Sequence, residues 1–401
     1  MRDTCTTHER GYTRRGILSL NLKSMSVVRF IWRLATAFAL ATLLSACSLP
    51  PAGSGARSLN LPPAFESTRS ESMDALTAEL ATRRVVYIGE THVRQDHHDT
   101  QLALIKALYA QNPSLAIGVE FFQQPFQRVL DDFIAGRIDE GELLEQSGYF
   151  SRWRYDYRLY QGIMQFARDN GIPIIGLNVP GAITHKVAVA GIDSLNEKER
   201  QWIPANIQRD IPGYRDRLAN IYAEHPESEH SNLEFFIEAQ LVWDESMAAR
   251  AAVYLGDNPA SRMVILAGSG HLAYGQGIPV RLERRIEVSS AIVLSLDHDQ
   301  AETGIADFVV HSEASTLPRN GLLGVILNLD DGRTITGFGE NSPAQAAGFS
   351  NGDRIVAIDG VSVATYSDIR LRLNGKAPGV TVHLTVRRGE TGQFAADVKL
   401  H

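Results

Sequence analysis

The chain has 401 residues, 44% of them hydrophobic and 21% charged, a composition typical of globular proteins and long enough for more than one domain. Its 39 Lys and Arg against 46 Asp and Glu give a formal net charge of -7. This acidic excess, without any run of basic residues, excludes nucleic-acid binding that depends on neutralising phosphates.

Residues 1–47 have the pattern of a secretory signal. Arg29 and Arg33 precede an apolar stretch, residues 34–44, that is too short to span a bilayer, which needs about 20 residues. The stretch runs into Leu-Ser-Ala-Cys, ending at Cys47, which resembles the bacterial lipobox. That resemblance implies lipidation of Cys47 as the new amino terminus. The alternative is an ordinary signal peptide with a chance cysteine.

The residues around the lipobox bear on location and redox chemistry. Ser48, rather than Asp, after the cysteine resembles signals for the outer membrane, so we expect an anchor there facing the periplasm. Residues 48–66, rich in Pro, Gly, Ser and Ala, predict a flexible tether. The only two cysteines are Cys5 and Cys47. Once the first is cleaved off and the second lipidated, no thiol remains, so any metal or haem must be held by His, Tyr, Glu or Asp.

The next part of the chain, residues 67–310, alternates short apolar runs with helical stretches. Runs rich in β-branched residues and ended by glycine are typical of parallel strands buried on both faces. We therefore predict an α/β domain with a largely parallel sheet flanked by helices. The expected strands are residues 84–88, 115–120, 172–177, 262–267 and 290–296, and a polar linker is expected at 311–320.

Four polar side chains follow three of these strands. Glu90 and His92 lie in Gly-Glu-Thr-His, Glu120 ends the second run, and His271 closes Gly-Ser-Gly-His. Because functional groups in parallel sheets collect beyond the carboxyl ends of strands, we expect these side chains to meet at one rim. Two carboxylates and two imidazoles suit a divalent metal, whose bound water could act as nucleophile while Glu90 or Glu120 accepts a proton. The alternative is a set of satisfied ion pairs.

Residues 321–401 change to short strands with frequent glycine. "GDRIVAIDG" after "SPAQAAG" resembles a PDZ domain, a small mixed β/α fold, over nearly the whole segment. The resemblance implies that Leu323, Gly324 and Val325 form a loop that binds a peptide carboxylate while the peptide adds a strand to the sheet edge. The loop departs from the family's Gly-Leu-Gly-Phe pattern in having Leu322 at the first position. A purely structural role is the alternative.

Four segments of the first domain together resemble the ChaN family of bacterial lipoproteins, over roughly residues 70–300. They are "VVYIGETHVRQDHHDTQL", "LAIGVEFF", "WDESMA" and "GSGHLAYGQGIPVRL". ChaN belongs with the Tiki, TraB and erythromycin-esterase-like proteins. The resemblance implies haem binding linked to iron uptake, with haem held through tyrosine at a dimer interface, and it places Glu90, His92, Glu120 and His271 in the superfamily's polar centre. Because Tiki members are described as metal-dependent proteases with paired Gly-x-x-His motifs, a metal-dependent hydrolase is the alternative function.

The haem ligand has several candidates. Tyr274 lies three residues after His271, and tyrosinate and imidazole both bind haem iron. Tyr274 could equally be a packed core tyrosine. The aromatic and basic stretch at 149–160 could sandwich a porphyrin and pair its propionates, or could simply pack on the core. His97 and His98, at the start of a helix, are weaker candidates.

These observations predict a membrane-anchored haem-binding lipoprotein involved in haem or iron uptake, with a PDZ module that docks a peptide. The competing predictions are the hydrolase and a regulatory scaffold whose polar centre is structural. Whether the protein is an enzyme stays open, and a homodimer is expected from the resemblance alone.

Overall fold

The computed structural model describes most of the chain beyond the amino-terminal 72 residues. The described ranges are 73–153, 155–224, 232–297, 300 and 302–401. The predicted signal segment, the lipidation site Cys47 and the whole tether therefore lie outside the described residues. Within those ranges, no helix is both long and apolar enough to cross a membrane.

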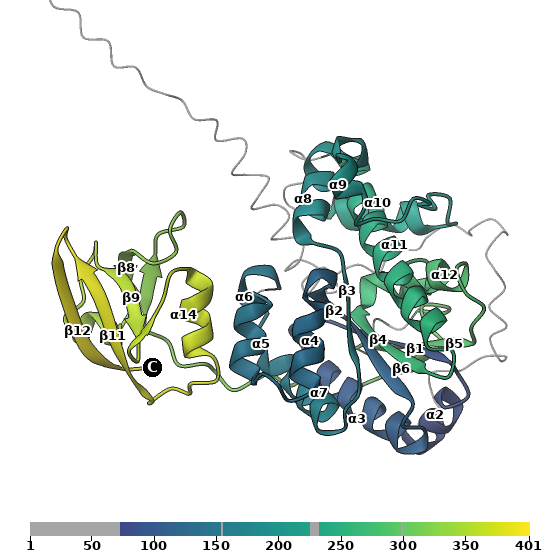
Figure 1. The fold of residues 1–401 in the computed structure, drawn as a ribbon, viewed down its shortest axis with the longest axis horizontal. Helices are drawn as coiled ribbons and strands as arrows, with labels where there is room; N and C mark the ends of the chain where they lie inside the picture. Colours follow the sequence, from purple (N-terminus) through teal and green to yellow (C-terminus); the bar gives the residue numbers. More distant parts are fainter. Residues whose placement is uncertain (1–72, 154, 225–231, 298–299, 301) are drawn as a thin grey trace, which may run out of the picture.

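The first domain is built on a six-stranded sheet with the strand order β3-β2-β4-β1-β5-β6 (Figure 1). Every neighbouring pair is parallel, which confirms the predicted fold class. The last strand was not predicted, because a run of three residues is too short to show a strand pattern. The strands are β1 (Val85–Glu90), β2 (Leu115–Gln123), β3 (Ile174–Asn178), β4 (Arg262–Gly268), β5 (Ser290–Ser295) and β6 (Phe308–Val310).

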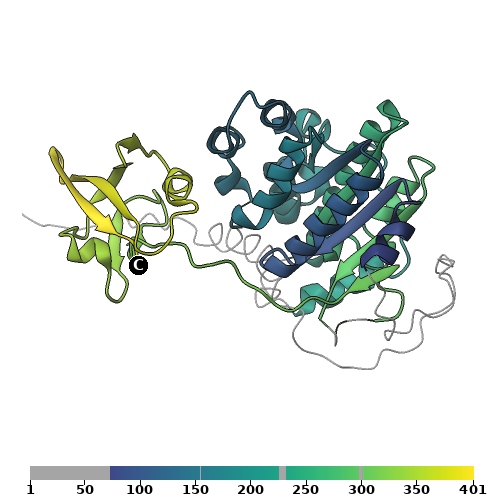
Figure 2. The same cartoon turned by 90° about the horizontal axis from the view of Figure 1, so that it is seen from below.

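Helices cover both faces of this sheet (Figures 1 and 2). In β1, side chains alternate between the two faces, so Val86 and Ile88 join one buried cluster and Val85 and Tyr87 the other. The first cluster includes residues of α2 (Met73–Leu80), α3 (Gln95–Gln111), α4 (Gln127–Ile134), α5 (Glu140–Gln146), α6 (Tyr149–Arg152) and α7 (Arg158–Asp169). The second includes residues of α11 (Leu233–Asp257) and α12 (Ile278–Glu283).

Shorter elements complete the first domain. They are η1 (Gln124–Phe126), α8 (Gly181–Ala190), η2 (Ile192–Ser194), α9 (Glu197–Arg200), α10 (Tyr214–Ala223), η4 (Ser269–His271) and η5 (Ala273–Gly275). The last two form the turn after β4, where the sequence placed the second Gly-x-x-His.

The carboxy-terminal domain has its own buried core and two small antiparallel sheets, β10-β9-β11-β12 and β7-β8, as expected for a PDZ fold. Gly324 adopts a φ of 70°, and a Cβ atom there would lie 2.9 Å from Ser342 and Pro343, which explains the glycine in the predicted loop. The elements are β7 (Val325–Leu327), β8 (Ile335–Phe338), α13 (Pro343–Ala346), β9 (Arg354–Ile358), β10 (Val361–Ser362), α14 (Tyr366–Leu373), β11 (Thr381–Arg388) and β12 (Gly392–Lys399).

Candidate functional site

A buried carboxylate–imidazole pair stands at the end of β1. The strand ends at Glu90, and His92 Nδ1 donates to Glu90 Oε1 over 2.8 Å. Burial alone would raise the pKa of the Glu90 carboxyl, but His98 and His92 outweigh it and hold that pKa below its usual range. Glu90 is therefore a carboxylate at neutral pH, and it holds the His92 ring with Nε2 turned away from it.

Two more side chains bind the same carboxylate. His98, in the first turn of α3, lies with Nδ1 3.0 Å from Glu90 Oε2 and donates from Nε2 to the His92 carbonyl over 3.1 Å. Burial lowers the pKa of His98, but the Glu90 carboxylate raises it by a larger amount, so the pKa lies above its usual value. The hydroxyl of Tyr160, on α7, donates to Glu90 Oε1 over 2.9 Å. The sequence offered these two residues only as possible haem contacts, and the structure uses them to orient Glu90.

A second pair lies at the end of β4. His271 Nδ1 donates to Asp244 Oδ1 over 2.6 Å, and Tyr214 donates to the other oxygen of Asp244 over 2.7 Å. Burial lowers the pKa of His271, but Glu120 and Asp244 raise it to about 10, so the ring is an imidazolium at neutral pH. Asp244 lies in the ChaN-like segment "WDESMA", but it was not predicted from the sequence as a site residue. The available signal was two consecutive carboxylates within a long, mostly apolar helix.

Glu120 connects the two pairs. Its Oε1 lies 3.4 Å from His271 Nε2, and its Oε2 accepts from the Gly268 amide over 2.8 Å. A Cβ atom at Gly268 would lie 3.0 Å from His92 Cε1 and 3.7 Å from Glu120 Oε2, so His92 also lies close to this point. Burial raises the pKa of Glu120, but His271 and His92 lower it more. The structure thus brings together all four residues that the sequence expected at one rim.

Aromatic rings flank both imidazoles. Trp153 and Tyr155 lie 4.9 Å and 4.8 Å from the His92 ring, and Trp243 lies 6.2 Å from the His271 ring, measured between centroids. The predicted aromatic stretch therefore supplies two rings to the centre.

The other members of that stretch serve the core. Tyr149 and Tyr157 are buried within the first-domain core cluster. Arg152 stacks on Phe126, and Arg158 pairs with Asp156 over 2.7 Å. Arg154 lies outside the described residues. Packing on the core thus accounts for most of this stretch.

The centre is not arranged like a metal site. In the described part of the chain, no group of three or more His, Cys, Asp or Glu side chains is placed to hold a metal ion. The predicted divalent-metal site therefore has no geometric support.

Tyr274 occupies a separate position beyond His271. It is half-buried, and its hydroxyl donates to Glu302 over 2.6 Å. Burial and Glu302 raise its pKa to about 12. Its φ of 59° is in the left-handed region, where a bulky side chain costs about 1–3 kcal/mol. Such strain on a half-exposed tyrosine is a recognised mark of function.

Arg217, on α10, fixes the turn that carries Tyr274. Its Nη1 donates to the Gly270 carbonyl and its Nε to Gln276 Oε1, each over 3.0 Å. The positive charge of Arg217 lowers the pKa of Tyr274 and so opposes the effect of Glu302. The turn is thus held on both sides of the tyrosine by one cation.

The predicted peptide loop lies at the start of β7. Leu323 is buried in the PDZ core, Gly324 takes its left-handed conformation, and Val325 begins the strand. Within the described residues β7 pairs with β8 alone, so its second edge carries no strand. This open edge is what strand addition by a peptide requires.

Two protein-family models match the chain. The model described as "Haem-binding uptake, Tiki superfamily, ChaN" covers residues 76–282, and a PDZ domain model covers residues 321–400. Both agree with the families predicted from the sequence.

Individual proteins are similar to parts of the chain. The plant protein RETICULATA-RELATED 5, chloroplastic, of Arabidopsis thaliana is 27% identical over 270 residues, which is 60% of this chain but only 36% of that protein, so the chain spans little more than a third of its length. The structure titled "Cofacial heme binding to ChaN of Campylobacter jejuni" is 18% identical with a TM-score of 0.50, covering 61% of this chain and 92% of that one. An erythromycin esterase structure is 15% identical with a TM-score of 0.35, covering 55% and 72%. The ChaN model covers more than half of the residues, and on that ground the chain belongs to the ChaN family of the Tiki superfamily, with a PDZ domain following the ChaN domain.

Proposed function

We propose that this protein binds haem in the service of haem or iron uptake. The family match supports a haem-binding domain, and the observation that carries the proposal within this chain is Tyr274. A strained, half-buried tyrosine is suited to bind ferric iron as tyrosinate, and the positive charge of Arg217 favours the anionic form. The bound haem would supply the ferric iron, and the chain would supply its ligand and the polar groups around it.

Tyr274 would be the preferred residue to hold the haem iron, and His271 is the second candidate. Both nitrogens of His271 already face carboxylates, Asp244 at Nδ1 and Glu120 at Nε2, and its ring is buried. The hydroxyl of Tyr274 has one partner and is more exposed. His271 would therefore have to give up two contacts to reach iron, whereas Tyr274 would give up its proton and the single contact with Glu302.

The cellular setting completes the proposal. Lipidation at Cys47 would tether the protein to the cell envelope, at the outer membrane facing the periplasm. The loop Leu323, Gly324 and Val325 would dock the carboxy-terminus of a peptide or protein against the open edge of β7. A homodimer sharing haem is proposed by analogy with the family.

A hemin titration tests the haem proposal. The soluble form starting at Ser48 is titrated with hemin and followed by absorbance. We expect a saturable Soret shift, and Tyr274→Phe should weaken binding at least about tenfold, or about 1.4 kcal/mol. Tyr366→Phe, an exposed PDZ tyrosine, is the matched control and should bind like wild type. His271→Ala, checked by circular dichroism, measures the second candidate. No saturable shift in the wild-type protein would refute the proposal.

Hydrolysis is the second candidate function, and the convergence of two carboxylate–imidazole pairs on Glu120 favours it. With Nδ1 bonded to Glu90, His92 has Nε2 as a proton acceptor for water, and protonated His271 is a proton donor. The arrangement supports acid–base chemistry by the side chains themselves. Turnover of p-nitrophenyl esters or a peptide library, measured with added Zn²⁺ and with EDTA, tests it. Turnover that survives in Glu90→Ala would show that the Glu90–His92 pair is not needed for such activity.

A further inference from the structure

The PDZ domain docks on the ChaN domain through α14. Arg372 Nη2 donates to Glu145 Oε2 on α5 over 3.0 Å, and the Arg370 guanidinium lies 4.9 Å above the ring of Phe150 on α6. Leu371, between them, packs against the first-domain core cluster. Figure 1 shows α14 beside α6 and α5. One polar, one cation–π and one apolar contact thus join the same helix to the ChaN domain.

The docked segment leads directly to the paired-histidine centre. Phe150 belongs to α6, and the chain continues from α6 into Trp153 and Tyr155, whose rings pack on His92. Trp153 Nε1 also donates to the Tyr160 hydroxyl over 3.1 Å, and that hydroxyl donates to Glu90. A displacement of α6 therefore acts on the His92 ring and on the side chain that orients its carboxylate.

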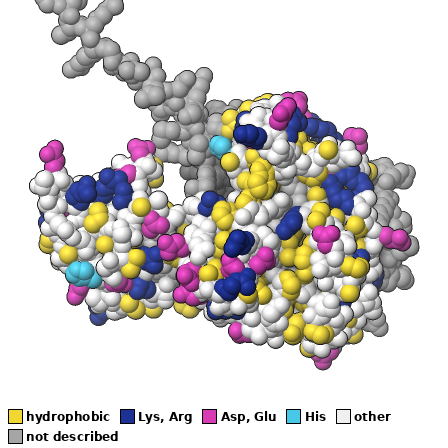
Figure 3. All heavy atoms as spheres, in the orientation of Figure 1, with side chains coloured by type: hydrophobic (Ala, Val, Ile, Leu, Met, Phe, Trp, Pro, Cys, Tyr) yellow, Lys and Arg dark blue, Asp and Glu magenta, His cyan; other side chains and the backbone are white. Residues whose placement is uncertain are grey.

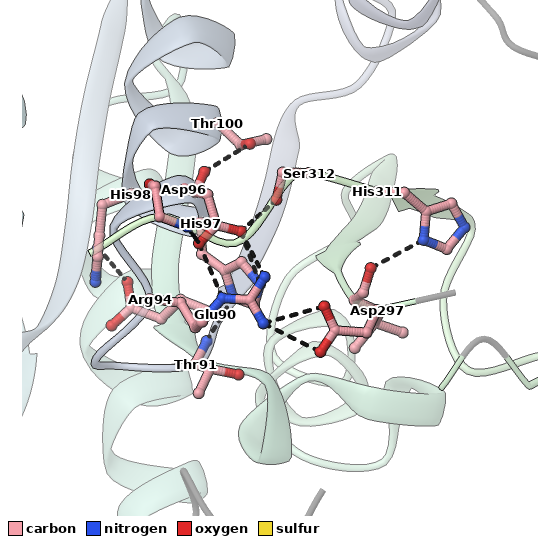
Figure 4. Close-up of polar contacts among 12 residues, drawn as sticks. Glu90, Thr91, Arg94, Asp96, His97, His98, Thr100, Asp297, His311 and Ser312 are labelled. Carbon is pink, nitrogen blue, oxygen red and sulfur yellow. Dashed lines mark hydrogen bonds and ion pairs between the residues drawn. The ribbon is translucent and has the colours of Figure 1, made fainter. Parts of the chain in front are cut away.

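The linker between the domains is tied to the same region. Ser312 Oγ and the Ser315 amide donate to the Asp96 carboxylate over 2.5 Å and 3.2 Å. Arg94 also pairs with Asp96, over 2.7 Å, and with Asp297, over 3.0 Å (Figure 4). Asp96 lies in the first turn of α3, two residues before His98. The predicted polar linker is thus fixed next to a residue that binds Glu90.

A second tie lies where the linker enters the PDZ domain. Asn320 donates to Asp156 over 2.8 Å, and Arg158 donates to the Pro318 carbonyl over 2.9 Å. Arg158 begins α7, the helix that carries Tyr160. The position of the PDZ domain is therefore linked to the supports of Glu90 from both α3 and α7.

A peptide at the PDZ domain would contact the same helix from its other side. Leu323 of the loop and Ile369 of α14 share the PDZ core, and the second edge of β7 is open in the described residues. Leu322 and Tyr366, at the start of the loop and of α14, have 57% and 51% of their surface exposed. These features fit an extended peptide with a free carboxylate and an apolar last residue.

We propose that α14 couples the PDZ domain to the paired-histidine centre, so that a peptide added to β7 changes the docking of α14 on α6 and with it the packing of Trp153 and Tyr155 on His92. The coupling is a property of the fold and stands whether the centre serves haem binding or hydrolysis. Because coupling free energies act in both directions, a ligand that contacts the centre alters peptide affinity by the same factor.

Trp153 gives a direct readout that needs no haem. The soluble form from Ser48 has three of the chain's 4 tryptophans, so Trp202→Phe and Trp243→Phe leave Trp153 as the only one. In this background, Arg370→Ala with Arg372→Ala removes the polar and the cation–π docking contacts and leaves Leu371 in place. We expect a red-shifted emission and a larger acrylamide quenching constant. Arg387→Ala, an exposed arginine on β11, is the control and should leave both unchanged.

Locking the contact gives the opposite test. The soluble form has no cysteine, so Glu145→Cys with Arg372→Cys can be bridged specifically by a bifunctional maleimide. The bridged protein should have a smaller quenching constant than the same protein before bridging. If release and locking both leave Trp153 like the control, α14 does not act on the centre and the proposal is wrong.

The peptide arm completes the experiment. The probe is the tightest binder from a library of random heptapeptides displayed with free carboxy-termini, selected on the soluble protein. The peptide should change the quenching of Trp153 in the single-tryptophan protein whose α14 contacts are unchanged. It should have no effect in the bridged protein. A library without a binder, or a binder without effect on Trp153, would refute the proposal that a peptide on β7 changes the docking of α14. The same proteins are also titrated with hemin, and we expect hemin affinity to change about fivefold or more when Arg370→Ala and Arg372→Ala release α14. This titration separates the coupling from the haem proposal, because Trp153 responds even where hemin does not bind.

Discussion

The two Gly-x-x-His turns are alike in sequence and differ in how the protein supports them. At the end of β1, His92 takes its carboxylate from Glu90, two residues away on the same strand. At the end of β4, His271 takes its carboxylate from Asp244, 27 residues away on α11. The first pair is therefore specified locally and the second by tertiary packing. The comparison teaches that a shared motif fixes the position of the imidazole but not the source of its partner.

The supports also differ in number, and this sets the largest expected effect. Glu90 is approached by His92, His98 and Tyr160, so Glu90→Gln removes the buried charge that all three side chains contact. We expect a loss of about 3–5 kcal/mol in the free energy of unfolding, measured by urea denaturation at pH 7. A loss below 1 kcal/mol would mean that Glu90 is not a buried structural anion. Glu79→Gln, on the exposed side of α2, is the control.

Asp244→Asn should cost less, because Glu120 still faces His271 and the new amide can still accept from Tyr214. We expect about 1.5–3 kcal/mol at pH 7, by the same measurement.

The pH dependence of stability sharpens this second test. The folded-state pKa of His271 is raised from 6.5 to about 10, so its stabilising contribution is complete below pH 6.5 and is lost as pH rises through 10. Wild-type stability should therefore fall across this window, and the fall should shrink in Asp244→Asn. An unchanged pH profile in the variant would show that Asp244 does not hold the proton on His271.

Gly268→Ala probes the point where the two turns touch. The new Cβ would lie 3.0 Å from His92 Cε1, so the ring of the first turn must move for a substitution in the second. We expect a cost of about 1–3 kcal/mol by urea denaturation, as for overpacked cores. If Gly256→Ala, where a Cβ meets nothing within 4 Å, costs as much as Gly268→Ala, the close approach of His92 is not the cause.

Tyr160→Phe and Tyr214→Phe compare the outermost supports of the two pairs. Each removes one hydroxyl that donates to a carboxylate and retains the ring. We expect about 1.5 kcal/mol for each, the low end for hydrogen bonds to charged groups, because the buried carboxylate retains a charged partner. Tyr160→Phe should in addition shift Trp153 emission, because it breaks the Trp153 hydrogen bond. A shift in both variants would point to a general loosening of the domain.

The sheet and half of the centre could be predicted from the sequence because their signals are local. Apolar runs marked β1, β2 and β4, those of β1 and β4 ended by glycine, and the polar residues that follow them meet as strand topology requires. Asp244 could not be assigned a role, because α11 is buried along much of its length and its pattern does not mark one face.

The residues that support Glu90 could not be predicted from the sequence for a different reason. His98 and Tyr160 lie on helices whose orientation around β1 is fixed only by packing, and no sequence spacing encodes the contact. Trp153 and Tyr155 were noticed as aromatic residues, yet their contact with His92 depends on the path of the chain after α6. The linker contacts with Asp96 likewise join segments more than 200 residues apart.

The proton on His271 has a consequence for how the protein meets changes of acidity. With a pKa of about 10, this ring keeps its charge from acidic conditions to well above neutrality. It is a permanent positive charge, like that of an arginine, and it does not respond to changes in the surrounding pH. Acidification alone would leave the charge of this ring unchanged, and a partner that needs a neutral ring there must supply the free energy that removes the proton.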